Sequence, residues 1–432
     1  MKYDVTIVGD RFVAWAAAAA LANRGMKCLL AGERDSGCGC SRIDSVEGFK
    51  FDFGVLADRL VCPEPEPLMS SAGLPCRLLP AGRPVYFGGS KLINIPSSSV
   101  GVMSSPLLNF GGRKEWVRMK KDLKKYRGDN EAYPVSVADW LSENNQYGND
   151  LMELINIRCA EATDEYDISV MPLAMFAEIL HDRSAGSLTV PLGGWNYLVE
   201  RMKSIIEGGG GQVRIGEKPE LIIEDKTAKG VRLSGDVYET DMVIIAEPVT
   251  HVIETIPEDV ISEDAKKMLG ELKPLSGLSL DLGLEEKIVR EDGVMLTLEP
   301  YTTGVAVSNI EPALAPRGCQ NISWFIPVED SGLESDDVIK RVQRQTKDVL
   351  EVIFPGITKK IAVERWKIVR NVLSALPAAG DPDRTRPGIK PFMVENMLMV
   401  NDAVGQPGFK AQPSADAALD AIRICEQSIN SK

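Results

Sequence analysis

The chain has 432 residues and carries 49 Lys and Arg residues against 62 Asp and Glu residues, a formal net charge of −13 at pH 7. This length exceeds the roughly 250–300 residues at which one hydrophobic core stops growing, so we expect two domains. With 44% hydrophobic and 26% charged residues, the composition excludes a disordered or fibrous chain, and the acidic balance argues against nucleic acid as a partner.

The cysteines, the histidines and the apolar runs exclude further classes. The longest apolar run, Phe12 to Ala22, is too short to cross a bilayer, and no secretory signal pattern precedes it, so we expect a cytoplasmic protein without a transmembrane segment. Eight scattered cysteines without paired C-x-x-C hooks indicate reduced thiols, and no metal site is predicted. The two histidines, His181 and His251, lie in periodic segments and are interpreted as structural.

The first thirty residues predict a strand, a helix and a second strand. Residues 5–8 are apolar and end at Gly9, residues 12–24 are rich in alanine and end at Gly25, and residues 27–31 are apolar again. A strand–helix–strand unit of this length crosses over right-handed, so we expect its two strands to be parallel in one sheet.

Farther along the chain, the patterns predict a hairpin, a group of helices and a return to strands. The hairpin pairs residues 85–87 with residues 92–95. Helices are expected at residues 113–127, 137–143, 150–162, 196–207, 336–353 and 415–429, and strands at residues 212–215, 221–224, 230–233, 242–246 and 397–400. No low-complexity linker divides the chain, so we expect its first and last segments to share one sheet.

Motifs along almost the whole chain occur in a specific order. They are the strand–Gly–helix unit, Phe51 to Gly54, Pro191 to Trp195, Val243 to Ala246, and Leu398 to Gly408. In this order they resemble the phytoene desaturase and flavin-containing amine oxidase superfamily. The resemblance implies an α/β fold, in which a Rossmann-type FAD/NAD(P)-binding domain is interleaved with a substrate domain of mixed sheet and helices. We expect the dinucleotide-binding-type domain to comprise residues 1–60, 190–250 and 385–432, and the substrate-type domain residues 61–189 and 251–384.

The first cofactor motif departs from the family at one position. In a turn of the form G-x-G-x-x-G, the second glycine lets the backbone approach a pyrophosphate. Here the turn begins with Gly9, Asp10 and Arg11, so an arginine stands in place of that glycine. Two interpretations stay open: Arg11 neutralises the phosphates from the side, or it occupies their place.

The second strand and the loop after it also differ from the family. The acidic residue that binds the ribose hydroxyls should end the strand, where this chain has Gly32, and Glu33 is displaced by one residue. The glycine-rich loop reads Cys38-Gly39-Cys40, with Arg42 close by as a substitute for the family's arginine. The two thiols are either small loop residues, which we favour because two ligands do not complete a metal site, or a redox or metal-binding pair.

Two later motifs complete the comparison with the family. Relatives hold the adenine through the backbone N–H of a residue that opens a strand; this position is Pro219, which has no N–H to donate. The family's C-terminal Gly-Asp pair reads Asn401-Asp402, and the N-terminus of the last helix would face the flavin phosphate or pyrimidine. The candidate cofactor-binding residues are therefore Gly9, Asp10, Arg11, Glu33, Gly39, Arg42, Asp402 and Gly408, and no catalytic residue is assigned.

Two functions stay open. In the first, bound FAD accepts a hydride from an isoprenoid-like or amine substrate between the domains. The substrate walls are then Met171, Leu173, Met175, Phe176, Leu180 and Trp324, unless these side chains form plain core, which their spacing favours. In the second, flavin binding is lost and the chain is a carrier, regulatory or partner-binding protein, like the GDP-dissociation inhibitors that resemble this superfamily. The lysines at 120–125 form either a solvated helix face, which we favour, or a contact with a membrane surface or an acidic partner.

Overall fold

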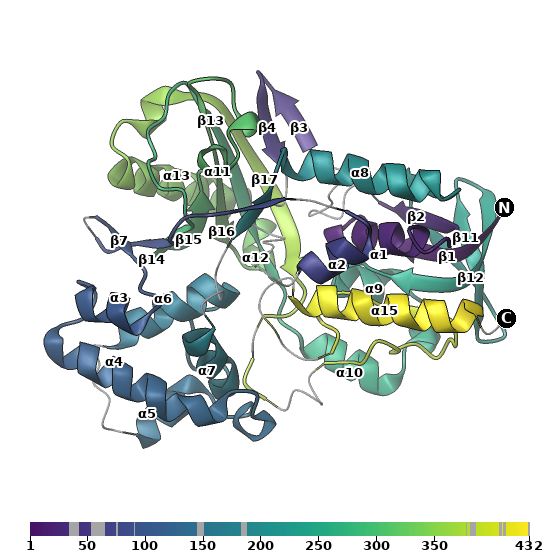
Figure 1. The fold of residues 1–432 in the computed structure, drawn as a ribbon, viewed down its shortest axis with the longest axis horizontal. Coiled ribbons are helices and arrows are strands. Elements are labelled where there is room, and N and C mark those ends of the chain that lie inside the picture. Colours follow the sequence, from purple (N-terminus) through teal and green to yellow (C-terminus); the bar gives the residue numbers. More distant parts are fainter. Residues whose placement is uncertain are drawn as a thin grey trace.

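The computed structural model describes residues 1–33, 43–52, 65–74, 77–89, 91–144, 151–182, 188–376, 378–380, 386–405, 408 and 412–430. Its helices and strands form two large sheets and a helical lobe (Figure 1). Both ends of the chain lie at the first sheet, on the side away from the helical lobe (Figure 1).

The first sheet is built around parallel strands. Its order is β10-β11-β12-β1-β2-β9, and β18 also pairs with β12. β1 lies between β12 and β2 and is parallel to both, which confirms the predicted strand–helix–strand unit and the α/β class. The strands are β1 (Lys2–Val8), β2 (Cys28–Gly32), β9 (Gln212–Ile215), β10 (Glu220–Glu224), β11 (Thr227–Leu233), β12 (Asp236–Ile245) and β18 (Met397–Met399). The first and last segments of the chain therefore share this sheet, as expected.

Helix α1 (Phe12–Ala22) is enclosed by protein on all sides. All eleven of its residues are buried, and most of them are alanine. Because these side chains are small, α8 (Gly194–Gly208) and α15 (Gln412–Asn430) pack closely against α1 from either side (Figure 1). The packing fixes the position of α1 and of the turn that precedes it.

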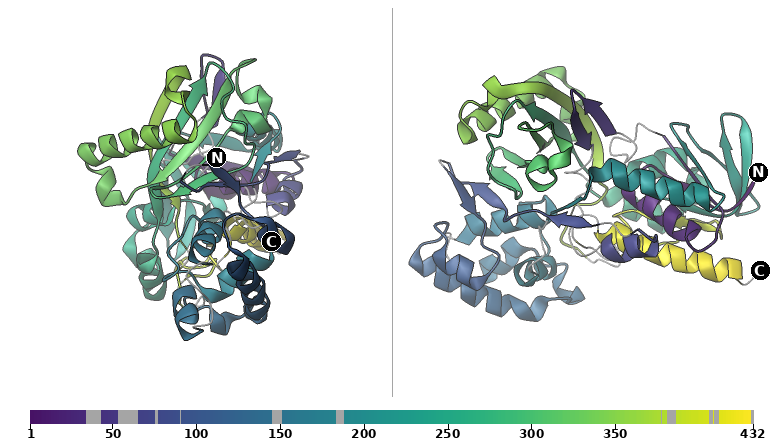
Figure 2. Two further views of the ribbon diagram at one scale, coloured as in Figure 1. Left: turned by 90° about the vertical axis from the view of Figure 1, so that its left-hand side faces the viewer. Right: turned by 45° about the horizontal axis from the view of Figure 1, so that its top comes forward.

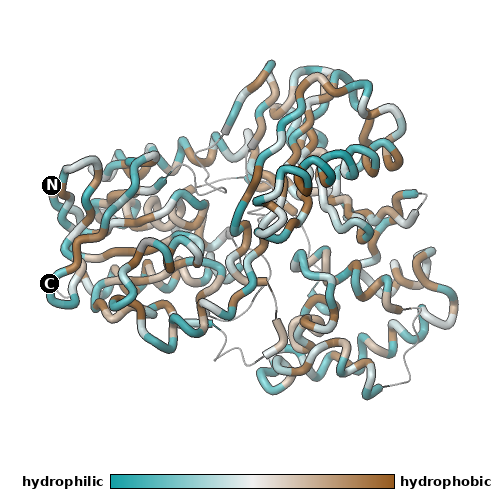
Figure 3. The backbone as a smooth tube through the Cα atoms, turned by 180° about the vertical axis from the view of Figure 1, so that it is seen from behind, coloured by the Kyte–Doolittle hydropathy of each residue, from teal (hydrophilic) through white to brown (hydrophobic). Residues whose placement is uncertain are grey.

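The second sheet takes its strands from the middle of the chain, in the order β17-β13-β16-β15-β14-β6-β7. The predicted hairpin is confirmed as β6 and β7. The strands are β6 (Val85–Phe87), β7 (Leu92–Asn94), β13 (Leu275–Leu284), β14 (Met295–Leu298), β15 (Tyr301–Val305), β16 (Gln320–Pro327) and β17 (Ile361–Leu373), and two small sheets pair β3 (Ile43–Val46) with β4 (Phe49–Asp52) and β5 (Leu78–Pro80) with β8 (Thr189–Pro191). Apolar residues run along the strands of both large sheets (Figure 3).

The helical lobe lies beside the second sheet (Figure 2). It consists of α3 (Ser99–Ser104), α4 (Phe110–Leu123), α5 (Val137–Glu143), α6 (Met152–Thr163) and α7 (Leu173–His181). Five of the six residues considered as substrate walls, Met171, Leu173, Met175, Phe176 and Leu180, belong to the core of this lobe, and Trp324 belongs to the core of the second sheet. Their burial in two separate cores favours the interpretation as plain core.

Helix α4 begins three residues earlier than the sequence pattern predicted. Its start lies at Phe110 rather than Arg113, because the side chain of Asn109 caps the helix and accepts a hydrogen bond from the N–H of Gly112 at 2.8 Å. The predicted end at Arg127 was also wrong, since the α-helix ends at Leu123 and a 3₁₀ turn follows.

The remaining helices cover the two sheets and connect their strands. The α-helices are α2 (Pro65–Ser71), α9 (Val249–Thr255), α10 (Glu263–Glu271), α11 (Val307–Ile310), α12 (Asp330–Leu333) and α13 (Asp336–Ile353). Within the described part of the chain, no helix is both long enough and apolar enough to cross a bilayer.

A glycine in the second sheet provides a test of this packing. A Cβ on Gly304 would stand 1.8 Å from Cε3 of Trp324, which is itself 1% exposed. Gly304→Ala should therefore lower the free energy of unfolding by about 2–3 kcal/mol through overpacking. Gly270→Ala is the matched control, because nothing lies within 4 Å of its Cβ in α10, and it should raise stability by about 0.5–1 kcal/mol. Urea unfolding of both variants makes the measurement, and equal stabilities would contradict the tight packing of Gly304 against Trp324.

Candidate cofactor site

The turn between β1 and α1 lies at the carboxyl edge of the parallel strands, where open α/β sheets bind their ligands. Gly9 opens the turn with a φ of +144°. A Cβ on Gly9 would stand 2.5 Å from the carbonyl oxygen of Ala246, at the end of the neighbouring strand. Because only glycine fits this space, the turn keeps the tight geometry that a dinucleotide-binding turn requires.

The next two residues have different surroundings. Asp10 is fully buried and accepts a hydrogen bond from Nε1 of Trp15 at 2.9 Å, so its carboxylate supports the first turn of α1. Arg11 is the N-cap residue of α1 and makes no capping hydrogen bond with its side chain. A helix start without a side-chain acceptor at its N-cap suits an anion, which would accept from the first N–H groups of the helix.

The side chain of Arg11 reaches from the first sheet to the end of the second. Its Nη1 donates to the carbonyl oxygen of Val372 at 3.1 Å, and its Nη2 donates to the carbonyl oxygen of Asn371. Arg11 is only 5% exposed. The guanidinium is therefore placed on the last residues of β17, and the structure shows it bridging the two sheets.

These last residues belong to a short segment, residues 371–375, that we call the crossover segment. Asn371 has a φ of +53°, and its side-chain amide donates to Oγ1 of Thr250 in α9. The N–H of Asn371 donates to Oγ of Ser276 at 3.0 Å. Each of these contacts comes from a different element, so the conformation of the crossover segment is fixed by its surroundings.

Asp402 holds the other end of the crossover segment. Its Oδ2 accepts hydrogen bonds from the N–H groups of Ser374, at 2.5 Å, and Ala375, at 3.2 Å. The buried guanidinium of Arg386 donates to the carbonyl oxygen of Asp402, while burial lowers the pKa of this arginine. Next to Asp402, the amide of Asn401 donates to the carbonyl oxygen of Glu247 at 3.0 Å. Asn401 thus ties the start of this loop to the end of β12.

The two positions expected to hold the adenosine are both occupied by residues without the required group. Gly32 ends β2, and a Cβ there would stand 2.9 Å from the carbonyl carbon of Gly9. The backbones of the two residues are in direct contact, which explains why no acidic side chain stands at residue 32. Pro219 directly precedes β10, as expected, and has no N–H for the adenine.

Glu33, the displaced acidic residue, is half-buried and belongs to a group of charges near α9. Nδ1 of His251, on α9, lies 3.3 Å from Oε2 of Glu247. The hydrogen bond that His251 donates to the carboxylate of Glu247 raises the pKa of His251, and the charges of Glu254 and Glu33 add to the effect. Glu33 therefore lies close enough to His251 to raise the pKa of this histidine. The binding of Glu33 to a ribose stays a prediction.

Three of the predicted residues cannot be joined to this arrangement. Gly39 and Arg42, together with Cys38 and Cys40, lie outside the described residues. Gly408 lines a cavity of about 320 Å³ between the helical lobe and the start of α15, where Tyr133 and Gln412 are also found. The N-terminus of α15 is therefore near Gly408, as expected.

Three residues that contribute to this region were not predicted from the sequence. Asn371, Ser374 and Arg386 contact Arg11 or Asp402 through the crossover segment or its neighbours. None of the sequence motifs described above includes these three residues. The partners come from segments far away in the sequence, so spacing alone gives no signal for them.

The residues fit one half of FAD better than the other. The Gly9 turn and the start of α1 suit the phosphates, and Asp402 is buried at the same junction of the two sheets. At the adenosine end, Gly32 supplies no carboxylate and Pro219 supplies no N–H. Arg11 stands at the N-cap of α1, where a phosphate would bind, and two of its donors are bonded to the crossover segment.

Comparison with known proteins is consistent with this fold. The family model described as flavin-containing amine oxidoreductase matches residues 88–423. Among solved structures, an oxidoreductase from Methanosarcina mazei superimposes with a TM-score of 0.78 at 20% identity, covering 98% of this chain and 100% of that one. No curated protein sequence matches the chain.

Two further structures share the fold at lower identity. Wild-type putrescine oxidase bound to putrescine has a TM-score of 0.69 at 16% identity, covering 100% of this chain and 99% of that one. A Rab GDI from Plasmodium falciparum has a TM-score of 0.61 at 12% identity, covering 99% and 98%. At these identities the likeness shows the shared fold alone.

The contact between Arg11 and the crossover segment can be tested by mutation. Arg11→Ala removes the donors of two backbone carbonyls at a buried position, so the free energy of unfolding should fall by about 1–3 kcal/mol. Arg423→Ala, which removes an exposed arginine from α15, is the control and should change stability by less than about 0.5 kcal/mol. Thermal or urea unfolding measures both, and equal effects would contradict a bridging role for Arg11.

The charge group around His251 predicts a dependence on pH. The raised pKa means that protonated His251 stabilises the fold fully below its ordinary pKa of 6.5, and that this contribution is lost as pH rises through the higher pKa of the folded state. The stability of the wild type relative to His251→Gln should therefore decrease as pH rises from about 6 to 8. Glu247→Gln should abolish most of this dependence. If the stability of the wild type relative to His251→Gln increased with pH, the raised pKa of His251 would be contradicted.

Proposed function

Because the chain belongs to the flavin-containing amine oxidoreductase family, we propose that it is a flavin oxidoreductase that oxidises a small amine or apolar substrate. The observation that carries the proposal is the junction of the two sheets. The Gly9 turn, the start of α1 and Asp402 lie there together, joined through the crossover segment. This is the edge of the parallel sheet at which a dinucleotide would be held.

The proposal gives each residue at the junction a defined task. A bound flavin would supply the electron-accepting chemistry. Gly9 gives the turn its tight geometry, and the N–H groups at the start of α1 would offset the negative charge of the phosphates. Asp402 accepts hydrogen bonds from the N–H groups of Ser374 and Ala375, which holds the crossover segment at the junction of the two sheets.

The missing adenosine contacts predict a cofactor held mainly through its flavin and phosphate parts. A lost hydrogen bond to a polar ligand group weakens binding by about 1–3 kcal/mol, which corresponds to a factor of roughly 5 to 150 in affinity. With Gly32 and Pro219 at the two adenosine positions, we therefore expect FAD and FMN to bind with similar, modest affinities.

The substrate class is supported only by likeness. The name of the family model supports an amine, as does the structural neighbour bound to putrescine. An isoprenoid-like substrate is the alternative that the resemblance to phytoene desaturases suggests. The acidic balance of the chain is more compatible with a cationic amine than with an anionic substrate.

A second candidate function is favoured by the contacts of Arg11. Its side chain stands where the family has no side chain. Two of its N–H groups donate to the crossover segment and are therefore not available to phosphates. A protein that has lost flavin and serves as a carrier, regulatory or partner-binding protein would need no open phosphate position. The fold is compatible with this alternative, since a Rab GDI shares it.

The visible spectrum of the purified protein distinguishes the two functions. A flavin oxidoreductase should show absorbance at about 450 nm, either as purified or after incubation with FAD or FMN, and should lose this absorbance on reduction with dithionite. A protein that stays colourless with excess FAD and with excess FMN contradicts the first proposal and supports the second.

Two substitutions test how the cofactor is held. Pro219→Val restores a backbone N–H at the adenine position, so it should raise the affinity for FAD by about tenfold and leave the affinity for FMN unchanged, because FMN has no adenine. Lys218→Val, at the exposed neighbouring residue, is the control and should change neither affinity. Flavin fluorescence titration measures the affinities of the wild type and of both variants for FAD and for FMN. An equal change in the two affinities of Pro219→Val would contradict the assigned position of the adenine.

The contribution of the junction itself is tested at Arg11 and Asp402. Asp402→Asn should weaken the binding of both flavins, whereas Arg11→Gly should leave it equal or make it stronger, because the glycine of the family is restored. Circular dichroism of each variant shows whether it is folded. Weaker binding in folded Arg11→Gly would indicate that the arginine contacts the phosphates directly.

A further inference from the structure

The outer surface of the helical lobe exposes large apolar side chains on two neighbouring helices. Val100 in α3 is 81% exposed and Phe110 at the start of α4 is 64% exposed, and Met103 and Val117 on the same two helices are also exposed. The helices pack against each other at the end of the lobe that is farthest from the first sheet (Figures 1 and 2). Exposed apolar residues that gather in this way indicate an interaction surface. We call it the α3–α4 surface.

The same surface is strongly basic. Residues 110–127 contain eight Lys and Arg residues and only two Asp and Glu residues, in a chain whose net charge is −13. Among the residues that the structure describes, neither Lys121 nor Lys124 forms an ion pair, and both are exposed. This segment is therefore positively charged in an otherwise acidic molecule, which favours the approach of an anionic partner from this side.

Apolar and basic residues alternate along one face of α4. Phe110, Lys114, Val117 and Lys121 are all exposed and follow one another at intervals of three or four residues, so they lie above one another on the helix. Nζ of Lys114 lies 4.4 Å from the centre of the Phe110 ring. The opposite face is buried in the lobe through Trp116, Met119 and Leu123. A helix with Phe and Val among lysines on its free face is typical of helices that lie in a membrane interface.

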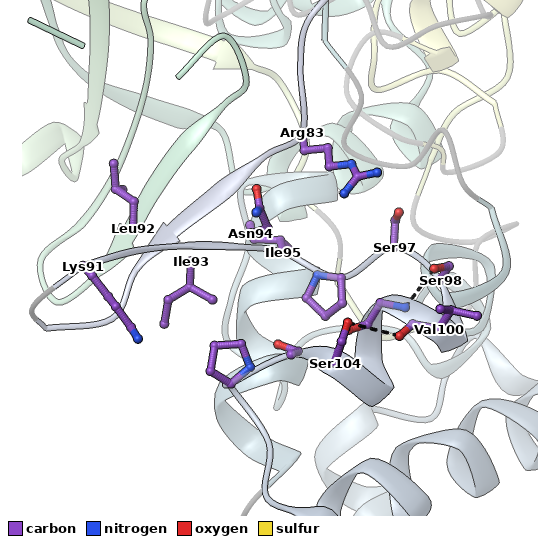
Figure 4. Close-up of a pocket in the computed structure, with 14 residues that line it drawn as sticks. Arg83, Lys91, Leu92, Ile93, Asn94, Ile95, Ser97, Ser98, Val100 and Ser104 are labelled. Carbon is purple, nitrogen blue, oxygen red and sulfur yellow. Dashed lines mark hydrogen bonds between the residues drawn. The ribbon is translucent and has the colours of Figure 1, made fainter. Parts of the chain in front are cut away.

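A polar cavity adjoins the exposed apolar residues of α3. It has a volume of about 540 Å³ and lies between β7 and α3 (Figure 4). Arg83 and Lys91 contribute positive charges to its lining, and Ser97 and Ser98 contribute hydroxyl groups beside Val100. Cationic and hydroxyl groups together are suited to a phosphate oxygen, so the cavity offers a place for a lipid headgroup next to the exposed side chain of Val100.

We propose that the α3–α4 surface docks on an anionic phospholipid membrane. Phe110 and Val100 enter the boundary between headgroups and acyl chains, and the lysines of α4 contact the headgroups. The cavity beside α3 accepts the phosphate of one lipid. This is a peripheral contact that needs no helix across the bilayer, and it is independent of whether the protein binds a flavin.

Sedimentation with lipid vesicles tests the proposal on the full chain. Vesicles of phosphatidylcholine with phosphatidylserine should bind the protein at ~50 mM salt and lose it at ~500 mM salt, because screening weakens the contact of the lysines with the headgroups. Vesicles of phosphatidylcholine alone should bind it at least about tenfold more weakly.

Charge reversal shows which surface is used. The double variant Lys121→Glu/Lys125→Glu should lower binding to the anionic vesicles by tenfold or more. The control variant Lys218→Glu/Lys229→Glu has the same net charge but changes two exposed lysines at the first sheet, and it should bind much more tightly than the first variant.

Polar substitution tests the apolar part of the surface. Phe110→Ser should weaken binding several-fold, whereas Ile253→Ser, at an exposed apolar residue elsewhere, should not. Unfolding curves show whether each variant is folded. The proposal is overturned if the wild type does not bind anionic vesicles at low salt, as an acidic protein partner would predict. It is also overturned if the wild type binds neutral vesicles equally well. The third contradicting result is an equal effect of the two lysine pairs, as an unspecific charge contact would predict.

Discussion

A buried guanidinium at the boundary between two sheets is the contact on which the arrangement of the site depends. Arg11 is the N-cap residue of α1, and two of its donors are bonded to backbone carbonyls at the end of β17. A buried charge without hydrogen bonds is strongly unfavourable, so the crossover segment must present its carbonyls to this side chain. The left-handed conformation of Asn371 and the contact of Ser374 with Asp402 follow along the same segment. The arginine that replaces the second glycine of the family motif is thereby part of the connection between the two sheets.

Much of the fold could be predicted from the sequence because its signals are local. The apolar run before Gly9 and the alanine-rich segment after it are short-range patterns, and they correspond to β1 and α1. The start of α4 was placed three residues late, since apolar periodicity does not detect a cap such as Asn109. The pairing of β13 with both β17 and β16 joins residues that are far apart in the chain, and a single sequence carries no direct record of such pairs.

The site was predictable in its positions but not in its contacts. Spacing identified Gly32 as the place where an acidic residue was missing, and the structure adds the reason, because the backbone of Gly9 fills the space that a Cβ would need. Asp402 was identified through its motif, whereas its hydrogen bonds to Ser374 and Ala375 could not be inferred. Arg386 carried no motif at all. Its role arises only when the loop after β18 and the crossover segment come together.

The complete burial of α1 has a consequence for how the protein moves. A helix with no exposed residue can exchange its amide hydrogens only when its neighbours α8 and α15 separate from it, and openings of that size belong to the rarest fluctuations of a fold. The turn at Gly9 is attached directly to this helix. A ligand that binds at the turn would therefore enter and leave by motion of the neighbouring segments, while the turn itself stays as still as the core.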